Sequence, residues 1–231
     1  MMVNTPLSRY QQDLQKPEFA EDSAQQLAVQ HLQRLYDELL AQPPQSEGWL
    51  ARLGIGKVNK EPVTGLYFWG GVGRGKTYLV DTFFDCLPFE QKLRMHFHRF
   101  MHRVHLERKA LRDQADPLVI IGKQLAKEAR VLCFDEFVVN DVADAVILVK
   151  LMRVLFDEGV TLVATSNVEP DNLYLGGLQR DLFLPAIAMI HQYTEVVNID
   201  SGIDYRLRFL DKAETYFTPV DQVARDGMQY N

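Results

Sequence analysis

Residues 70–78 carry the clearest chemical signal in the sequence. They read Gly70-Gly71-Val72-Gly73-Arg74-Gly75-Lys76-Thr77-Tyr78. The first eight match the pattern Gly-x-x-x-x-Gly-Lys-Ser/Thr, in which successive backbone N–H groups form a nest for phosphate oxygens. Lys76 would reach the β- and γ-phosphates, and the Thr77 hydroxyl would be a ligand of Mg²⁺. The loop therefore predicts binding of a nucleoside triphosphate with Mg²⁺, and a chance glycine-rich turn is the alternative.

Two adjacent acids follow an apolar run further along the chain. Residues 131–134 predict a buried strand, and Asp135 and Glu136 come directly after it. Beside a triphosphate, the first acid would hold Mg²⁺, usually through water, and the second would polarise the attacking water as a general base. Two carboxylates at the end of a buried strand are costly unless a cation compensates them. The alternative is a strand that simply runs out into a polar loop.

Two further polar residues have positions suited to a γ-phosphate. Asn167 follows the apolar run 161–165 and could hydrogen-bond that phosphate or the lytic water, although capping of the next turn is a rival role. Arg180 comes just after a pair of glycines. In ring-forming ATPases an arginine so placed reaches into the neighbouring subunit's site and stabilises charge on the γ-phosphate. A surface ion pair with Asp181 or Asp171 accounts for Arg180 equally well.

A histidine-rich segment raises the question of a metal site. Four of the six histidines of the chain lie within ten residues: His96, His98, His102 and His105. On a helix, His98 and His102 would share a face, as metal ligands often do. No carboxylate or cysteine completes a ligand set there, and Arg99 and Arg103 would repel a cation. We therefore expect a surface that contacts a partner or another subunit, with phosphate or nucleic-acid contact as a further option.

The elements that must position these residues alternate along the chain. Short apolar runs predict strands at residues 66–69, 93–97, 131–134, 161–165 and 195–199. Helix-period patterns between them predict helices at residues 76–86, 99–113, 118–129, 142–157 and 181–192. This alternation is typical of a parallel sheet with helices on both faces and ligands at the carboxyl ends of its strands. We expect a three-layer α/β domain around a five-stranded parallel sheet.

The chain divides into three parts. Residues 1–61 form a helical N-terminal segment, residues 62–200 the α/β core, and residues 201–231 the start of a further region. In the first part, Asp22 or Ser23 can cap a helix that runs through Ala41. That helix either helps to hold a nucleotide base or simply packs on the core, and packing is the simpler interpretation.

Composition narrows the class of protein. Of 231 residues, 47% are apolar and 24% charged, as in ordinary soluble globular proteins. The net charge of −6 gives no overall attraction to nucleic acid. Only two cysteines occur, so we expect no disulfide framework. We expect the protein to work in a reducing compartment. The amino terminus does not read as a targeting signal, and charged residues interrupt the most apolar segment, 142–156, so we expect a cytoplasmic protein.

Together, these motifs resemble those of AAA+ ATPases. The individual residues within them resemble those of the ZapE family, which has bacterial members and mitochondrial relatives. The resemblance runs from about Thr5 to Arg208 and rests on five stretches: Gly65–Thr77, Met95–Met101, Cys133–Phe137, Leu162–Asn167 and Gly177–Pro185. By this resemblance the fold is a P-loop domain of AAA+ type. It makes residues 70–77 the ATP loop, Asp135 and Glu136 the Walker B pair, Asn167 the first sensor and Arg180 the finger.

The resemblance also implies a function. Bacterial members act as Mg²⁺-dependent ATPases on the division-ring GTPase FtsZ, whose polymers they destabilise at constriction, at the inner face of the membrane. Mitochondrial relatives are linked to the turnover of respiratory-complex subunits, and the absence of a presequence here favours the bacterial role. A homo-oligomer that assembles through the ATP site is implied, and nucleic acid is not an expected partner.

One departure and two alternatives accompany this interpretation. AAA+ proteins normally follow the fifth strand with a helical lid that carries a second sensor arginine, and residues 201–231 are too few to form one. We therefore expect a truncated C-terminal region without that lid. The alternatives are a helicase-loader-like ATPase of DNA replication, which has the same core motifs, and a switch that binds ATP but scarcely hydrolyses it.

Overall fold

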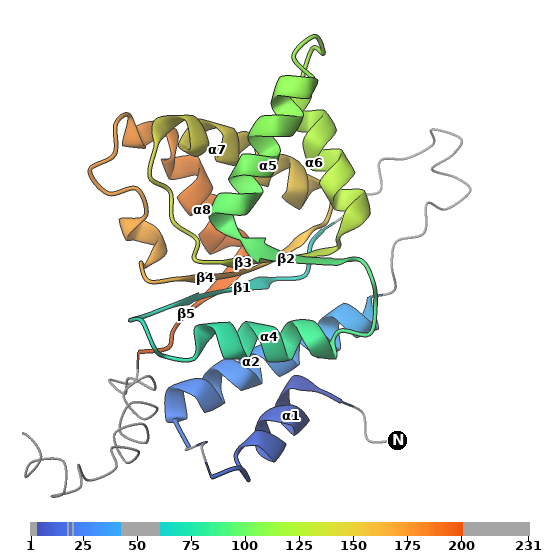
Figure 1. Ribbon diagram of the computed structural model, residues 1–231, viewed down its shortest axis with the longest axis vertical. Coiled ribbons are helices and arrows are strands. Elements are labelled where there is room, and N and C mark those ends of the chain that lie inside the picture. The colour runs from blue at the N-terminus through green and yellow to red at the C-terminus, as the bar shows by residue number, and fades with distance from the viewer. Residues whose placement is uncertain (1–3, 18, 20, 43–60, 201–231) are drawn as a thin grey trace, which may run out of the picture.

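A five-stranded, wholly parallel sheet runs through the centre of the molecule (Figure 1). The structure is a computed structural model that describes residues 4–17, 19, 21–42 and 61–200. The strands are β1 (Gly65–Trp69), β2 (Lys92–His96), β3 (Val131–Asp135), β4 (Thr161–Ser166) and β5 (Thr194–Asn198), in the spatial order β2-β3-β4-β1-β5. All five predicted strands are present, each within a residue or two of its expected bounds.

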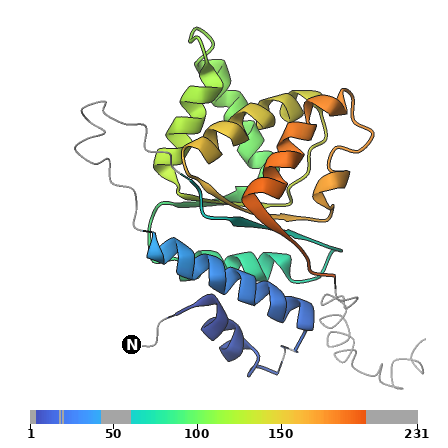
Figure 2. The ribbon, with the colours of Figure 1, turned by 180° about the vertical axis from the view of Figure 1, so that it is seen from behind.

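Helices cover both faces of the sheet, which makes three layers (Figures 1 and 2). On one face lie α1 (Pro6–Asp13), α2 (Ser23–Ala41) and α4 (Lys76–Cys86). On the other lie α5 (Phe97–Ala110), α6 (Pro117–Glu128), α7 (Val142–Asp157) and α8 (Leu184–Tyr193), with short 3-10 turns η1 (Pro170–Asn172) and η2 (Arg180–Leu182) before α8. The predicted three-layer α/β architecture is confirmed.

The sheet separates two hydrophobic cores, and β3 shows how the sequence produces them. Its side chains alternate: Val131 and Cys133 pack into the core beneath α4, whereas Leu132 and Phe134 pack into the core under α5 and α7. Successive residues of a strand point to opposite faces. Asp135 therefore points toward the face on which α4 lies, because it continues the alternation of Val131 and Cys133.

The predicted N-terminal helix is confirmed as α2, and a second helix precedes it. The Asp22 carboxylate caps α2 by accepting the N–H groups of Ala24 (2.7 Å) and Gln25 (3.2 Å). Helix α1 is not among the predicted helices, because it is short and mostly polar; its apolar contacts come from Leu7 and Tyr10, which pack against the core beneath α4. So short a helix is marginal in water, and this one owes its stability to a capping box at Thr5 and to packing against its neighbours.

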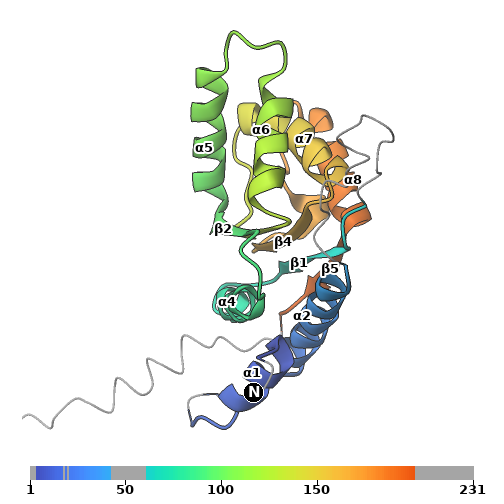
Figure 3. The same cartoon turned by 90° about the vertical axis from the view of Figure 1, so that its right-hand side faces the viewer.

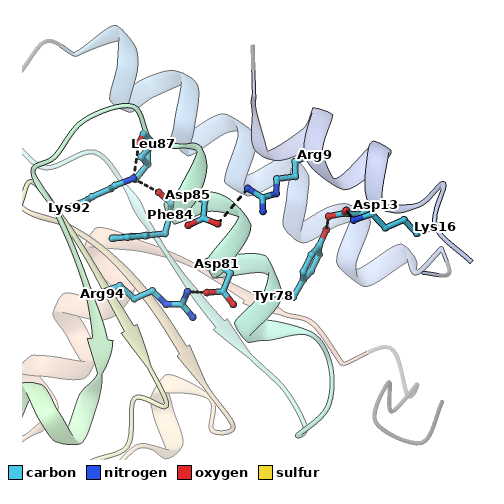
Figure 4. Close-up of polar contacts among 10 residues, drawn as sticks. All are labelled: Arg9, Asp13, Lys16, Tyr78, Asp81, Phe84, Asp85, Leu87, Lys92 and Arg94. Carbon is cyan, nitrogen blue, oxygen red and sulfur yellow. Dashed lines mark hydrogen bonds and ion pairs between the residues drawn. The ribbon is translucent and has the colours of Figure 1, made fainter. Parts of the chain in front are cut away.

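Polar contacts join α1 to the helix that follows the glycine-rich loop (Figure 4). The Tyr78 hydroxyl donates a hydrogen bond of 2.6 Å to the Asp13 carboxylate, which also pairs with Lys16. Arg9 lies 3.5 Å from the Asp85 carboxylate on the same face of α4. These contacts are what the packing interpretation of the N-terminal segment expects, and a role in holding a nucleotide base stays a prediction.

Helix boundaries differ most from the sequence-based expectation at α5, which is shifted at both ends from the expected 99–113, and at the start of α8. Helix α5 begins at Phe97, which was assigned to the end of a strand, because this ring turns into the core and lies 4.5 Å from the ring of Phe137. The last helix was expected from residue 181, but a 3-10 turn comes first and α8 begins at Leu184. Residues 201–231, where a lid was expected to be missing, lie outside the described part.

None of the helices in the described ranges combines the length and the hydropathy needed to cross a bilayer.

Candidate nucleotide-binding site

The glycine-rich loop joins the end of β1 to the start of α4. Gly73 and Gly75 both have φ of 80°, in the left-handed region that glycine enters without strain. A Cβ at Gly75 would lie 2.5 Å from the Gln25 side-chain nitrogen, which donates to the Arg74 carbonyl at 3.2 Å. Glycine at position 75 thus allows both the loop conformation and the close approach of α2.

Lys76 lies over this loop. Its ammonium donates hydrogen bonds of 2.7 Å to the carbonyl oxygens of Gly70 and Gly71. Burial lowers the pKa of Lys76 below its ordinary value, while nearby Asp200 opposes that shift and Arg74 adds to it. The amine is therefore held close to the nest and does not extend into solvent. In this position it can contact the oxygens of a bound phosphate.

Arg74 supplies the observation that tests whether a polyphosphate fits here. Its Nε lies 2.9 Å from the Asp200 carboxylate, whereas its Nη1 is buried and makes no hydrogen bond within the described residues. A buried guanidinium donor without an acceptor is costly. A phosphate oxygen would satisfy such a donor, so Arg74, Lys76 and the loop N–H groups fit a polyphosphate.

Asp135, the expected Mg²⁺ residue, is held by an arginine that the sequence analysis did not single out. Arg94 of β2 donates to both carboxylate oxygens, from Nε at 2.9 Å and from Nη2 at 3.1 Å. The third guanidinium nitrogen, Nη1, bonds Asp81 of α4 (Figure 4). Arg94 and Asp135 are both largely buried, with side-chain exposures of 15% and 9%. Arg94 is thus the cation that compensates the acid at the end of this buried strand.

These contacts are compatible with a magnesium ion bound through water. Each carboxylate oxygen has two lone-pair sites, so two N–H donors leave Asp135 with capacity to accept from a metal-bound water. Asp135 points to the face of α4, and Thr77 lies in the first turn of that helix with its side chain exposed. Thr77 and Asp135 therefore fit a hydrated Mg²⁺ next to the loop.

Glu136 has an unusual backbone conformation. Its φ is 55°, which is rare for a residue with a β-carbon and costs about 1–3 kcal/mol. Its N–H donates to the Thr165 hydroxyl at 3.3 Å, and the next N–H, of Phe137, donates to the Thr165 carbonyl at 2.7 Å. These bonds to β4 hold the turn. The Glu136 carboxylate is exposed and has no partner among residues whose placement is described, so it is available to a water.

The structure weakens the rival role of Asn167. The turn after β4 is capped by Ser166, whose hydroxyl accepts the N–H of Val168 at 3.1 Å. Asn167 is exposed and makes no hydrogen bond in the described part of the chain. Because Trp69 of β1 is in register with Ser166, Asn167 and Gly70 both follow the paired ends of adjacent strands. Asn167 is thus brought to the loop, as the sensing hypothesis requires.

Arg180 makes neither of the ion pairs considered for it. Its Nη2 donates to the main-chain carbonyl of Asp171 at 2.6 Å, while the Asp171 carboxylate pairs with His191 at 3.0 Å. Its Nε is buried without a hydrogen-bond partner in the described ranges. No interaction seen there joins Arg180 to residues 70–77, so its own subunit gives it no contact with the phosphate loop, and the finger role stays a prediction.

The histidine segment bridges β2 and α5. His96 ends the strand, and its ring stacks on that of His98 at 5.7 Å between centroids. His105 instead bonds the Asp144 carboxylate at 2.6 Å. Within the residues described, no three histidine, cysteine, aspartate or glutamate side chains are grouped so that they could hold a metal ion.

Comparison with known proteins agrees with the motif-based resemblance. The family model described as AFG1-like ATPase matches residues 4–231. The chain is 49% identical to the cell division protein ZapE of Escherichia coli K12 over 236 residues. That alignment covers 99% of this chain and 63% of the relative, so the chain spans less than two thirds of the relative's length.

Solved structures agree on the fold. The crystal structure of DnaI superimposes with a TM-score of 0.53 at 15% identity, over 78% of this chain and 87% of that one. AMPPCP-bound DnaA from Aquifex aeolicus gives 0.53 at 13% identity, over 92% of this chain and 60% of that one. At such identities the likeness concerns the fold alone, and the expected P-loop architecture is confirmed.

We predict that Lys76→Ala and Glu136→Gln separate nucleotide binding from turnover. Lys76→Ala should lose most affinity for a fluorescent ATP analogue, because the loop loses the ammonium that lies over it. Glu136→Gln should bind the analogue nearly as well as the parent but release phosphate slowly, since an amide is not a base. An equal loss of binding in the two variants would contradict the assigned roles.

We also predict that Arg94→Met destabilises the protein by leaving Asp135 without its cation. Loss of one member of a buried ion pair costs about 3–5 kcal/mol, and urea unfolding should show a loss in that range. Adding Asp135→Asn removes the stranded charge, so the double variant should recover part of the stability.

Lys92→Met is the matched control for this double-mutant cycle of positions 94 and 135. Lys92 lies on the same face of β2, but its ammonium donates to the main-chain carbonyls of Phe84 and Leu87 (Figure 4). Its effect on stability should therefore be the same with Asp135 or Asn at position 135. If positions 94 and 135 show no coupling either, Arg94 acts through Asp81 or through packing.

Proposed function

Because the chain belongs to the AFG1-like ATPase family, we propose that it binds ATP with Mg²⁺ and hydrolyses it to ADP and phosphate. One observation carries this proposal: the loop of residues 70–77, Asp135, Glu136 and Asn167 all lie at the carboxyl ends of parallel strands β1, β3 and β4. Ligands of open α/β sheets bind at that edge. The phosphate nest, the acid and the base thus share one side of the sheet.

The residues of the chain divide the work as follows. The loop N–H groups and the Lys76 ammonium bind the phosphates and stabilise the charge that develops on them. The exposed Glu136 carboxylate accepts a proton from the attacking water, which the Asn167 amide orients. When bound beside Thr77 and Asp135, Mg²⁺ would neutralise further phosphate charge.

We place this ATPase in bacterial cell division. The support is the 49% identity with a relative named as a cell division protein, over nearly the whole of this chain. We propose that ATP turnover is coupled to the destabilisation of FtsZ polymers at constriction. The site of action would be the cytoplasm, with peripheral association at the inner face of the inner membrane.

An arginine from a neighbouring subunit would further stabilise the charge that develops on the γ-phosphate. We propose that Arg180 is that finger in a homo-oligomer assembled through the ATP site. One observation favours this assignment: Arg180 forms no ion pair with the described residues, and its one hydrogen bond there goes from Nη2 to the main-chain carbonyl of Asp171. An arginine that only served a surface ion pair would face a carboxylate.

The division role can be tested by sedimentation and phosphate release. FtsZ polymerised with GTP should lose polymer mass when the parent chain and ATP are added, and FtsZ should raise the rate of ATP hydrolysis. Lys76→Ala should do neither, and Glu136→Gln should bind polymers without dissolving them. The coupling would be refuted if FtsZ did not change the ATPase rate and if the chain with ATP did not change the FtsZ polymer mass. Salt-dependent binding of DNA in their place would favour the helicase-loader alternative.

The finger role predicts recovery of activity on mixing two inactive variants. Arg180→Ala should keep its affinity for ATP but lose about 10³–10⁵ in turnover rate, as when other arginine fingers are removed. Glu136→Gln is inactive for a different reason, so mixed assemblies contain some interfaces with both residues intact. Activity should then reappear. If light scattering confirms mixed assemblies but no activity returns, Arg180 does not act in the site of a neighbouring subunit.

A further inference from the structure

A basic hollow lies where the end of α5 meets the start of α6. Its volume is about 510 Å³, and it is lined by His105, Arg108, Lys109, Arg112 and Pro117. No acidic side chain lines it. The α5–α6 hairpin extends from the face of the sheet opposite α4, so this hollow is separate from the glycine-rich loop (Figure 3).

The side chains of the hollow come from the end of α5 and from the turn that follows it. Positions 105, 108 and 109 have the spacing i, i+3 and i+4, which brings side chains together on an α-helix. Arg112 lies in the turn after Ala110, where the helix ends. Two guanidinium groups and one ammonium group thus lie within five residues, 108–112.

Carboxylates near the hollow leave its two central cations without partners. Asp144 bonds His105 at 2.6 Å. Asp113 lies 3.8 Å from Arg112, and the side chains of Asp113 and Arg112 are both exposed to solvent. Arg108 and Lys109 are exposed and make no ion pair or hydrogen bond with the described residues. Two positive charges thus remain uncompensated at its centre.

The next carboxylates along both helices are already engaged. Glu107 of α5 pairs with Arg103 at 2.6 Å, and Asp116, which precedes α6, pairs with Lys150 at 2.8 Å. Asp116 would have to break its pair with Lys150 to reach either cation, and the second carboxylate oxygen of Glu107 is buried, with no hydrogen-bond partner in the described residues. Neither carboxylate forms an ion pair with Arg108 or Lys109 in the structure.

The helix dipole accounts for part of this arrangement. Cations in the last turn of a helix interact favourably with its dipole, by about 0.3–1 kcal/mol each. Arg108 and Lys109 lie in the last turn of α5, so the dipole favours positive charge at both positions. It does not supply either side chain with an acceptor, so the donors of Arg108 and Lys109 remain available to an anion.

We propose that this hollow binds an acidic segment of a protein partner through two or more of its carboxylates. Guanidinium groups bind carboxylates through paired, charge-assisted hydrogen bonds, and a lysine adds a compact charge. Leu106, one turn before Lys109 and Ala110 on the same helix, is 56% exposed and offers an apolar contact beside the cations. An acidic peptide with intervening apolar side chains matches both features.

Other polyanions match the hollow less well. Single-stranded nucleic acid stacks its bases on aromatic side chains, and among the described residues His105, which is held by Asp144, is the one aromatic side chain that lines this hollow. Membrane-surface helices expose a broad apolar face, whereas Leu106 is the one large apolar side chain that α5 exposes, and Phe100 and Val104 are buried in the core. The proposal goes beyond ATP hydrolysis, because none of its residues belongs to the nucleotide site.

The test measures anisotropy of a labelled peptide of alternating glutamate and leucine, bound to the whole chain. The double variant Arg108→Glu/Lys109→Glu should bind about tenfold to a hundredfold more weakly, because two attractive charge contacts become repulsive. The matched control is Lys123→Glu/Lys127→Glu, which makes the same change of net charge on exposed positions of α6 outside the hollow. The control should bind nearly as well as the parent.

Three outcomes would overturn the proposal. The first is a parent chain that does not bind the peptide, and the second is equal weakening in the two charge-reversed variants, which would indicate diffuse attraction. The third is a preference for pyrophosphate, a single-stranded oligonucleotide or phosphatidylglycerol vesicles that the Arg108/Lys109 variant loses. Lys76→Ala should still bind the peptide, so a failure of the ATPase proposal leaves this one testable. Unchanged circular dichroism should confirm that each variant is folded.

Discussion

The arrangement of the candidate site depends on the burial of β3 between two hydrophobic cores. Each core takes alternate side chains of that strand, and β2 and β4 fix its register through parallel pairing. A slip of one residue would exchange the two faces of the strand. Asp135 would then point toward α5 and α7, away from α4 and from the loop that precedes it. Packing along this one strand therefore decides where the acid lies.

Three cations at the nucleotide edge contact groups of the protein itself, although Arg74 keeps one buried donor without an acceptor in the described residues. Arg94 binds Asp135 and Asp81, Arg74 lies against Asp200, and the Lys76 ammonium is bonded to loop carbonyls. Such contacts limit the cost of holding charges in a partly buried site. A triphosphate that enters must compete for Arg74 and Lys76, whereas Arg94 can stay on Asp135. The site is thus arranged so that part of its positive charge is exchangeable and part is fixed.

The chemistry that follows from short segments was predictable, because its parts lie within a few consecutive residues. The loop conformation depends on the glycines at 73 and 75, and the apolar run before Asp135 is buried wherever it pairs. Strand and helix identity followed from period-two and helical patterns. The errors are the missed helix α1 and several element boundaries, as at Phe97, where a large apolar residue can end a strand or begin a helix that packs on the same core.

What the sequence by itself determined is therefore the set of reactive groups and the elements that carry them. Only the tertiary structure decided their partnerships. Arg94 meets Asp135, 41 residues away, because β2 and β3 are adjacent and in register. Ser166, not Asn167, caps the turn after β4, and Arg108 and Lys109 face a hollow because α6 folds back on α5. Such contacts depend on strand order and helix packing, which local patterns do not encode.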